Sequence, residues 1–474
     1  MSEERRIYLL DNKKLNPETI AVAFAKTSRS PQSFDQIAQE LSDEKSSEFH
    51  EKWVVGYGHA SVAEHAILHI AVENISRLAV ECLESNRLAS YTEKSSRYQV
   101  WDEEHYFIPD EIKDTKLVDI YKSTVSTLFQ HYLEALPILQ HRVSEKLRGG
   151  NREVSEREIH AHCMDVCRYY LPAAATANVG MTINARSLEH ALQKMLSHPL
   201  EEVRQIGHEI KQVAITHLPT LVKYVDEVAY LKQADERTAA LSAAAPNLSP
   251  SEERWCELVE YDKQFEERIL SALLYRYGNS SFREYENSLK NYSVEEKRTL
   301  LDILFNQMGV HDIPLRELEY SWFLFDVVMD QGAYFEFKRH RMMSQTPQAL
   351  SPYYGYAVPR LITDSGLEKH FNRAMALAKN AYKQIAPFNP HVASYVIPNA
   401  FNRRVLAAFN LRSAHHFIKL RSAPNAHFAI RRVACRMAEM ITSKMDFFKP
   451  YFQFSQSETW EQIEEEYFTT TLQN

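Results

Sequence analysis

The feature that most constrains the fold of this chain is a short polar motif that occurs twice. Asn184-Ala185-Arg186-Ser187 and Asn410-Leu411-Arg412-Ser413 each open a segment with helical spacing. A basic, polar stretch precedes each copy, Ser85–Tyr98 in the first half and Arg339–Tyr353 in the second. The same ordered set of features in both halves indicates that the chain contains an internal duplication.

The spacing between these features supports the duplication. Arg87 precedes Asn184 by 97 residues, whereas Arg341 precedes Asn410 by 69 residues. The difference of 28 residues predicts an insertion in the charged, helical region at about 101–160 of the first half.

Composition limits the kinds of protein that this chain can be. A length of 474 residues predicts two or three domains, and 45% hydrophobic with 25% charged residues is typical of a globular protein. A net charge of −8 argues against a partner that is polymeric nucleic acid. Five cysteines favour a reducing compartment, and we expect a cytoplasmic protein without a membrane partner. Only 11 glycines disfavour a glycine-rich dinucleotide fold.

The coarse pattern places a domain in each half. Residues 239–252, rich in alanine, proline and serine, are interpreted as a linker between a first domain, 1–238, and a second, 253–474. In the first domain a His/Glu loop, a strand, a helix and a polar loop follow in order. The second half repeats this with an apolar strand at Trp322–Val327 and a helix that reaches Lys338.

Two groups of side chains raise the possibility of a metal site. His65 and His69 would share a face of a helix, but the alternating pattern predicts a strand, which separates them by about 13 Å. A loop that contacts a polar ligand is therefore favoured there, and no metal ligand is assigned. His160, His162 and Cys163 have ligand types that suit zinc, yet no second half-site follows, so core cysteines and a surface histidine pair are favoured.

The basic cluster Arg339-His340-Arg341 ends an apolar segment. A solvated basic turn is the usual meaning of such a cluster. Cations that converge at the end of a buried element also suit a phosphate or an electron-rich ring system, and we favour this second interpretation.

Taken together, these motifs resemble those of the flavin-dependent thymidylate synthases. That family carries R-H-R-x-x-S-x-N-E-x-S-x-R-Y, preceded by G-H-x-S-x-x-E-H and followed by R-x-x-L-P and N-x-R-S-x-x-x-x-x-x-L-R. The resemblance extends over nearly the whole chain, once in each half. It implies an α+β fold made of two tandem copies of a domain with a mixed sheet and long helices.

Each half keeps a different part of the family pattern. The first half keeps the acidic end of the long motif and the R-x-x-L-P arginine, and the second keeps the Arg-His-Arg end and the late arginine. The first half retains Gly58, His59, Ser61, Glu64, His65, Arg87, Ser90, Glu93, Ser95, Arg97, Tyr98, Arg168, Asn184, Arg186 and Ser187. The second half retains Arg339, His340, Arg341, Ser344, Asn410, Arg412, Ser413, Leu420 and Arg421, and Glu319 is a candidate for the motif glutamate.

The losses are complementary. At some motif positions each half has a residue that departs from the family pattern. These residues are Ser85, Asn86, Thr92 and Met195 in the first half, and Pro347, Ala349, Ser351 and Ser394 in the second. By resemblance, the substrate-binding residues are Glu93, Ser95, Arg97, Tyr98, Arg168 and Arg421. By the same resemblance, the FAD-contacting residues are His59, Ser61, Glu64, Arg339, His340, Arg341, Asn410, Arg412 and His416. A homodimer of the fused chain would then imitate the family's homotetramer.

The resemblance implies reductive methylation of dUMP at C5, with methylenetetrahydrofolate as carbon donor and NADPH as the source of reducing equivalents through FAD. Arg421 is the candidate catalytic residue, because a fixed guanidinium stabilises negative charge on the uracil carbonyl. Alternatives are methylation or hydroxymethylation of another pyrimidine nucleotide, and a non-catalytic paralogue that binds flavin or nucleotide. A zinc hydrolase built on His160, His162 and Cys163 is a third alternative.

Overall fold

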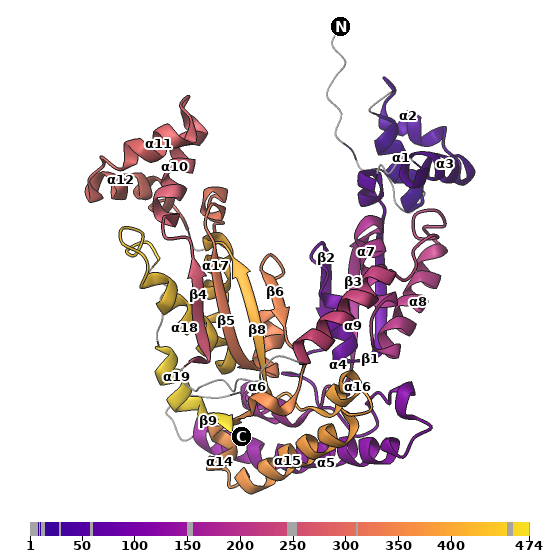
Figure 1. Ribbon diagram of the computed structural model, residues 1–474, viewed down its shortest axis with the longest axis vertical. Coiled ribbons are helices and arrows are strands. Elements are labelled where there is room, and N and C mark those ends of the chain that lie inside the picture. The colour runs from indigo at the N-terminus through magenta and orange to yellow at the C-terminus, as the bar shows by residue number, and fades with distance from the viewer. Residues whose placement is uncertain are drawn as a thin grey trace. The chain divides into compact units, whose positions relative to one another are not determined.

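The computed structural model describes residues 8, 10, 15–27, 30–56, 60–148, 155–243, 254–309, 311–452 and 458–473. The chain forms two compact units (Figure 1). The first unit comprises residues 1–95, 105–118 and 174–247, and the second comprises 96–104, 119–173 and 248–474. The middle of the first repeat, including Arg97 and Arg168, thus packs within the second unit. The predicted domain division at 239–252 follows the repeats in sequence, whereas the compact units interleave them.

The first unit is built on a three-stranded antiparallel sheet. Its strand order is β1 (Ile67–Ser76), β3 (Thr176–Asn184), β2 (Ala89–Glu93). The strand predicted after the His/Glu loop is confirmed as β1. The stretch Ser85–Tyr98, expected to be a polar loop, instead contains β2, because its backbone pairs with β3 over five residues.

The other regular elements of this unit are helices. Those of the first unit are α1 (Pro17–Lys26), α2 (Phe34–Gln39), α3 (Asp43–Phe49), η1 (His50–Gly56), η2 (Ala60–His65), α4 (Arg77–Glu84), η3 (Asp110–Ile112), α7 (Ala185–Leu196), α8 (Glu201–Ile215) and α9 (Ala229–Ala243). The first five residues of the predicted linker are the end of α9, and residues 244–252 lie outside the described residues.

The second unit has a four-stranded antiparallel sheet and a separate strand pair. The sheet order is β4 (Cys256–Tyr261), β5 (Phe323–Asp330), β8 (Asn402–Phe409), β6 (Ser344–Pro347). Figure 1 shows β5 and β8 at the centre of this sheet. The two-stranded sheet pairs β7 (Tyr356–Pro359) with β9 (Phe468–Gln473).

The helices of the second unit come from both repeats. They are α5 (Leu117–Arg148, from its third residue on), α6 (Glu156–Cys167), η4 (Arg168–Tyr170), α10 (Phe265–Tyr277), α11 (Phe282–Leu289), α12 (Val294–Phe305), η6 (Arg316–Glu319), α13 (Gln331–Phe337), η7 (Pro352–Tyr354), α14 (Arg360–Asp364), α15 (Glu368–Ile385), α16 (Pro390–Ala393), η8 (Ser394–Val396), α17 (Leu411–Arg421), α18 (Phe428–Thr442) and α19 (Trp460–Tyr467). No helix in the described part of the chain is long and apolar enough to cross a membrane.

Strand register aligns the two repeats residue by residue. Ser90 lies opposite Thr182 in the first sheet, and Ser344 lies opposite Ala408 in the second. Both partners stand two residues before the asparagine of the Asn-x-Arg-Ser motif. The strands that carry the two long motifs therefore have the same register against their central strands, which supports the alignment made from the sequence.

A bulge in β1 places one extra residue in this strand of the first repeat, relative to the matching strand of the second repeat. Ser76 and Asp330 each accept a hydrogen bond from the backbone N–H three residues on and cap α4 and α13. Between Val72 and Ile75 the register of β1 shifts, and Asn74 adopts φ +57°. An extra residue in one strand is absorbed in this way, and asparagine tolerates the left-handed conformation.

Equivalent segments of the two repeats meet within the second unit. Pro172 and Pro398 form an antiparallel bridge. Ala173 N donates to Ile397 O, and Asn399 N donates to Leu171 O, each at 3.0 Å. Because matched residues of the two repeats pair reciprocally, the bridge has approximate local two-fold symmetry.

The predicted insertion at 101–160 is not a separate module. The order α5, α6, η4 in the first repeat corresponds to α15, α16, η8 in the second. α5 has 32 residues against 18 in α15, and α6 has 12 against four in α16. Most of the additional length is therefore an extension of helices that both repeats possess.

Candidate active site

Each Asn-x-Arg-Ser motif begins a helix in the same way. Asn184 Oδ1 accepts a hydrogen bond from Ser187 N at 2.8 Å, and Asn410 Oδ1 accepts one from Ser413 N at 2.9 Å. The asparagine is thus the N-cap of α7 and of α17, which satisfies a backbone donor that a helix start leaves without a partner. The expectation that each motif opens a helix is confirmed.

The motif arginines make matching ion pairs. Arg186 Nη1 lies 2.5 Å from Glu64 Oε1, and Arg412 Nη1 lies 2.5 Å from Glu319 Oε1. Glu319 therefore pairs with the motif arginine of its own repeat, as Glu64 does. This equivalence supports the assignment of Glu319 as the motif glutamate of the second repeat. Burial raises the pKa of Glu319, but the hydrogen bond from Arg412 and the nearby Arg316 hold it below its usual value.

The opposite end of α17 contributes Arg421. Its Nε donates to His340 Nε2 at 3.0 Å, and its Nη1 donates to Glu336 Oε2 at 2.6 Å. Arg339 Nε lies 3.7 Å from the same carboxylate oxygen. The side chains of Arg421 and Glu336 are each 15% exposed, so the ion pair is mostly buried but still accessible to solvent.

His340 is held neutral. Burial, with the charges of Arg421, His416 and the flanking arginines, lowers the pKa of His340 to about 3. Because Nε2 accepts from Arg421, the ring hydrogen resides on Nδ1. His416 lies beside it, with ring centroids 5.5 Å apart. The ring therefore presents an uncharged, oriented surface at neutral pH.

Arg97 belongs to the first repeat. Its Nε and Nη2 donate to the two carboxylate oxygens of Asp165, on α6, at 2.6 and 2.9 Å. This bidentate arrangement fixes the plane of the guanidinium. The pKa of Arg97 and that of Arg421 both respond to the charge of Glu336, so the three groups share one electrostatic neighbourhood.

Arg168 lies deeper in the same unit. It is 1% exposed, and its Nη2 donates to Gly332 O at 3.2 Å. Its Nε has no hydrogen-bond partner among the described residues. Burial raises the pKa of Glu336, and the charges of Arg339, Arg421, Arg168 and Arg97 outweigh this effect and lower it.

We call Arg97, Arg168, Arg339 and Arg421, with Asp165, Glu336 and His340, the guanidinium cluster. Its members come from both repeats and lie in the second compact unit. Four guanidinium groups outnumber the carboxylates among them, even when Asp330, which the charge of Arg168 reaches, is included. Such an excess of forked donors suits a phosphate-bearing ligand.

The remaining predicted substrate residues are divided between the two units. Glu93 and Ser95 belong to the first unit, where Glu93 Oε1 lies 2.6 Å from Arg77 Nη1 and its side chain is 1% exposed. Tyr98 belongs to the second unit and is 55% exposed. The contribution of these residues to a ligand site stays a prediction.

The predicted FAD contacts are distributed. His59 lies outside the described residues. Ser61 lines a pocket of about 640 Å³ in the first unit, whose walls also include Phe24, Trp53 and His65. Arg341 follows the cluster in the chain and is half-buried. Asn410 and Arg412 stand at the start of α17, one helix length from Arg421.

The alternative zinc group does not assemble among the described residues. Cys163 and Cys167 are buried in the core with their sulfur atoms 3.6 Å apart, and His160 contacts the backbone carbonyl of Tyr98. All five cysteines are free thiols. The interpretation of Cys163 and Cys167 as core residues is confirmed.

Sequence reasoning missed Asp165 and Glu336. Neither belongs to a recognised motif, and each acquires its role only from an arginine that is 68 and 85 residues away in the chain, respectively. Glu336 stands three residues before Arg339 at the end of a helical pattern. This spacing is the one local signal that could have identified Glu336.

The chain is similar to several known proteins. A UPF0159 protein of Chlamydia muridarum is 29% identical over 436 residues, which cover 88% of this chain and 82% of that protein. A flavin-dependent thymidylate synthase of Clostridium tetani is 30% identical over 212 residues, 44% of this chain and 82% of its own. A structure of the Helicobacter pylori flavin-dependent thymidylate synthase, complexed with FAD and dUMP, aligns at 21% identity and a TM-score of 0.29 over 44% of this chain and 96% of its own.

The family model described as thymidylate synthase complementing protein matches residues 9–220 and again residues 257–445. The two matches cover one repeat each and together most of the chain. This α+β protein therefore belongs to the thymidylate synthase complementing protein family, and it carries two tandem copies of the family's domain.

Proposed function

We propose that the chain catalyses flavin-dependent reductive methylation of dUMP to dTMP, with methylenetetrahydrofolate as the carbon donor and NADPH as the reductant. The active site would use residues of both repeats, and the chain would act as a homodimer that imitates a tetramer of single-domain subunits. The relative from Clostridium tetani, named as a flavin-dependent thymidylate synthase, supports this reaction class.

The observation that carries the proposal is the guanidinium cluster itself. Arg97 and Arg168 come from the repeat that lacks the Arg-His pair and the late arginine. Arg339 and Arg421 come from the repeat that lacks the acidic end of the long motif. The fold gathers these complementary remnants in one compact unit. Random decay in a protein without ligand-binding function would have no reason to preserve complementary residues in one place.

The residues present fit a flavin and a nucleotide. The buried Nε of Arg168 is a donor that has no acceptor among the described residues, and the excess of guanidinium charge suits a phosphate. Neutral His340 offers a planar, uncharged contact for a ring system. Arg339, His340 and Arg341 would hold FAD, with Arg412 and His416 from α17, and bound FAD would supply the hydride for reduction.

Arg421 has the geometry of a group that stabilises developing negative charge. Its guanidinium is oriented by Glu336 through Nη1 and by His340 through Nε. A donor fixed in this way needs no reorganisation as charge forms on a pyrimidine carbonyl. Glu93, Ser95, Tyr98 and Arg97 are proposed to bind the sugar and phosphate of the nucleotide.

The test uses the purified full-length chain. We expect it to take up FAD with the yellow colour of a flavoprotein, to oxidise NADPH in a dUMP-dependent reaction, and to release tritium from dUMP labelled at C5. Arg421→Ala should abolish tritium release. Arg142→Ala is the control, because Arg142 is an exposed α5 residue that forms an ion pair with Glu145 on the same helix. A chain that takes up no FAD would refute the proposal.

A panel of nucleotides distinguishes the related reactions. We expect dUMP to be preferred over UMP and dCMP, and the product to be dTMP by mass. A hydroxymethylated product, or release of label from another pyrimidine alone, would assign a different reaction to the same site. FAD uptake without turnover of any nucleotide would indicate a binding paralogue instead.

A further inference from the structure

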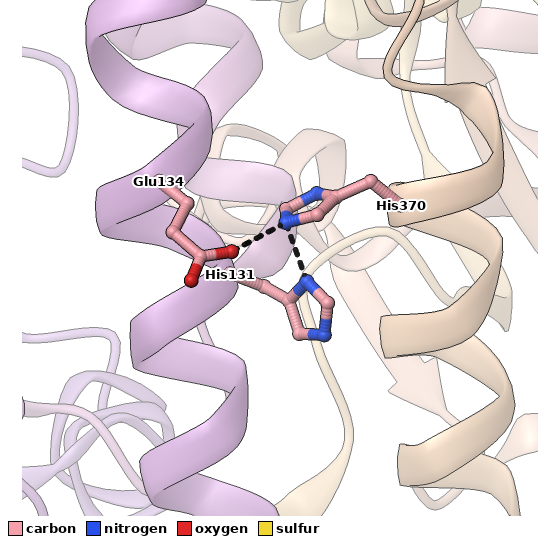
Figure 2. A group of neighbouring side chains, drawn as sticks. All are labelled: His131, Glu134 and His370. Atoms are coloured by element: carbon pink, nitrogen blue, oxygen red, sulfur yellow. Dashed lines mark hydrogen bonds and ion pairs between the residues drawn. The ribbon is translucent and has the colours of Figure 1, made fainter.

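A cluster of metal-ligand side chains joins two helices of the second unit, outside the guanidinium cluster. His131 and Glu134 lie on α5, and His370 lies in the first turn of α15. One ligand atom from each lies within 4.8 Å of the other two. Figure 2 shows the three side chains pointing toward a common point between the helices.

The spacing on α5 is that of a helical ligand pair. His131 and Glu134 are three residues apart, so both project from one face of the helix toward α15. α5 belongs to the first repeat in sequence and α15 to the second. The cluster therefore connects segments that are 239 residues apart in the chain and packed within one unit.

Hydrogen bonding alone leaves the cluster poorly satisfied. His370 Nε2 lies 2.6 Å from His131 Nδ1 and 3.0 Å from Glu134 Oε2. A ring nitrogen carries at most one hydrogen, so Nε2 has one well-aligned bond to offer to two neighbours. A cation at their common point would interact with all three lone pairs at once.

A buried tyrosine orients the central histidine. His370 Nδ1 lies 3.1 Å from the hydroxyl oxygen of Tyr170, which is fully buried. When Nδ1–H donates to this oxygen, Nε2 presents its lone pair toward His131 and Glu134. Metal-bound histidines characteristically engage their second ring nitrogen with such an oxygen partner.

We propose that His131, Glu134 and His370 form a zinc site that ties α5 to α15. Two histidines and one glutamate are a known ligand set for Zn²⁺, with the fourth position left for water. Tetrahedral bonds of about 2.1 Å place donor atoms roughly 3.4 Å apart. The two histidine nitrogens, 2.6 Å apart, would have to separate to this distance by small side-chain rotations. Glu134 has room to adjust its position, because its side chain is 67% exposed.

A zinc ion at this site would hold α5 and α15 together while its fourth position carries water. It would add a link between the two repeats within the second unit, close to η4, which contains Tyr170 and Arg168. Nothing in this inference depends on flavin chemistry, so it is tested separately from the reaction proposed above.

The first experiment measures stoichiometry on the full-length chain. Chelator-treated protein is titrated with Zn²⁺ and analysed for bound metal after dialysis, and we expect one equivalent per chain. Co²⁺ loading should give the visible absorption of a tetrahedral site. Zn²⁺ should also raise the midpoint of thermal unfolding, since the ion binds the folded state. No bound metal above the buffer level would overturn the proposal.

Variants locate the site. His131→Gln, Glu134→Gln and His370→Gln should each weaken Zn²⁺ binding by about 100-fold or more, and Tyr170→Phe by roughly 10-fold, as expected for a group behind a ligand. His141→Gln is the matched control, because His141 is exposed on the same helix and lies beside Glu145, away from the three ligands in the helix sequence. If His370→Gln fails to fold, the exposed Glu134→Gln variant still reports on the site.

A second control excludes the alternative ligands. Cys163→Ser should leave Zn²⁺ affinity unchanged, because Cys163 is buried in the core and bonds to Leu136 O and Cys167. Binding that survives His370→Gln but disappears with Cys163→Ser would assign zinc to the cysteine pair and refute the proposed site.

Discussion

Arg421 donates a hydrogen bond from Nε to Nε2 of His340 at 3.0 Å, across 81 residues of sequence. This contact links the last residue of α17 to the basic segment that follows α13. It requires a neutral histidine, and the burial and surrounding arginines that lower the pKa of His340 to about 3 ensure that state. Two motif fragments of the second repeat are thereby held as one unit.

The first prediction concerns catalysis by Arg421. Arg421→Gln should lower kcat for dUMP-dependent tritium release by on the order of 100-fold, the usual cost of losing one fixed donor to a developing anion. KM for dUMP should change less. Steady-state kinetics measures both, and a variant with an unchanged kcat would exclude Arg421 from the catalytic step.

The second prediction concerns acid stability. The folded pKa of His340 is about 3, below the usual 6.5, so the unfolded chain binds the extra proton between these values. Stability from this group is present above about pH 6.5 and is lost as the pH falls toward 3, with a slope of at most ~1.4 kcal/mol per pH unit. Urea denaturation across this range should show a shallower pH dependence in His340→Gln. An identical slope in both proteins would contradict the assignment.

The third prediction concerns the fork of Arg97. Arg97→Lys keeps the charge but cannot make the bidentate contact with Asp165. Losing an oriented, charge-assisted hydrogen bond to the nucleotide costs roughly 1.5–3 kcal/mol, so dUMP affinity should fall by about 10- to 100-fold. Isothermal titration calorimetry provides the measurement, with Arg142→Lys as the control. Wild-type affinity in Arg97→Lys would separate Arg97 from the nucleotide site.

The fourth prediction concerns complementation between chains. Arg97 and Arg421 lie in the same compact unit of one chain. Mixing the Arg97→Ala and Arg421→Ala variants under conditions that exchange subunits should therefore restore no activity, because every active site would contain one of the two substitutions. Recovered turnover in the mixture would show instead that the two arginines act together across subunits.

The fifth prediction concerns the contact between the repeats. Asn399 is 2% exposed, and its Nδ2 donates to Arg168 O at 2.9 Å. Asn399→Ala leaves that buried carbonyl without its side-chain donor and should cost about 1–2 kcal/mol of unfolding free energy. Chemical denaturation measures the change. Asn291→Ala, at an exposed position, should stay within about 0.5 kcal/mol of wild type.

The elements that the sequence predicted correctly are those with local causes. Asn184 and Asn410 cap helices through a bond to a residue three positions on, and such bonds form from neighbouring residues alone. The strand β1 follows from alternation of polar and apolar residues. The strand β2 was missed because its polar residues carry no such pattern, and pairing with β3 decides its conformation.

What the sequence by itself determined is the duplication, the family and the complementary loss of motif residues, because these are properties of residue order. Only the tertiary structure decided which residues meet. Asp165 and Glu336 became partners of Arg97 and Arg421, and His370 came to face His131, through packing of segments tens to hundreds of residues apart. Such contacts depend on how buried faces fit together, and no local pattern in the chain encodes them.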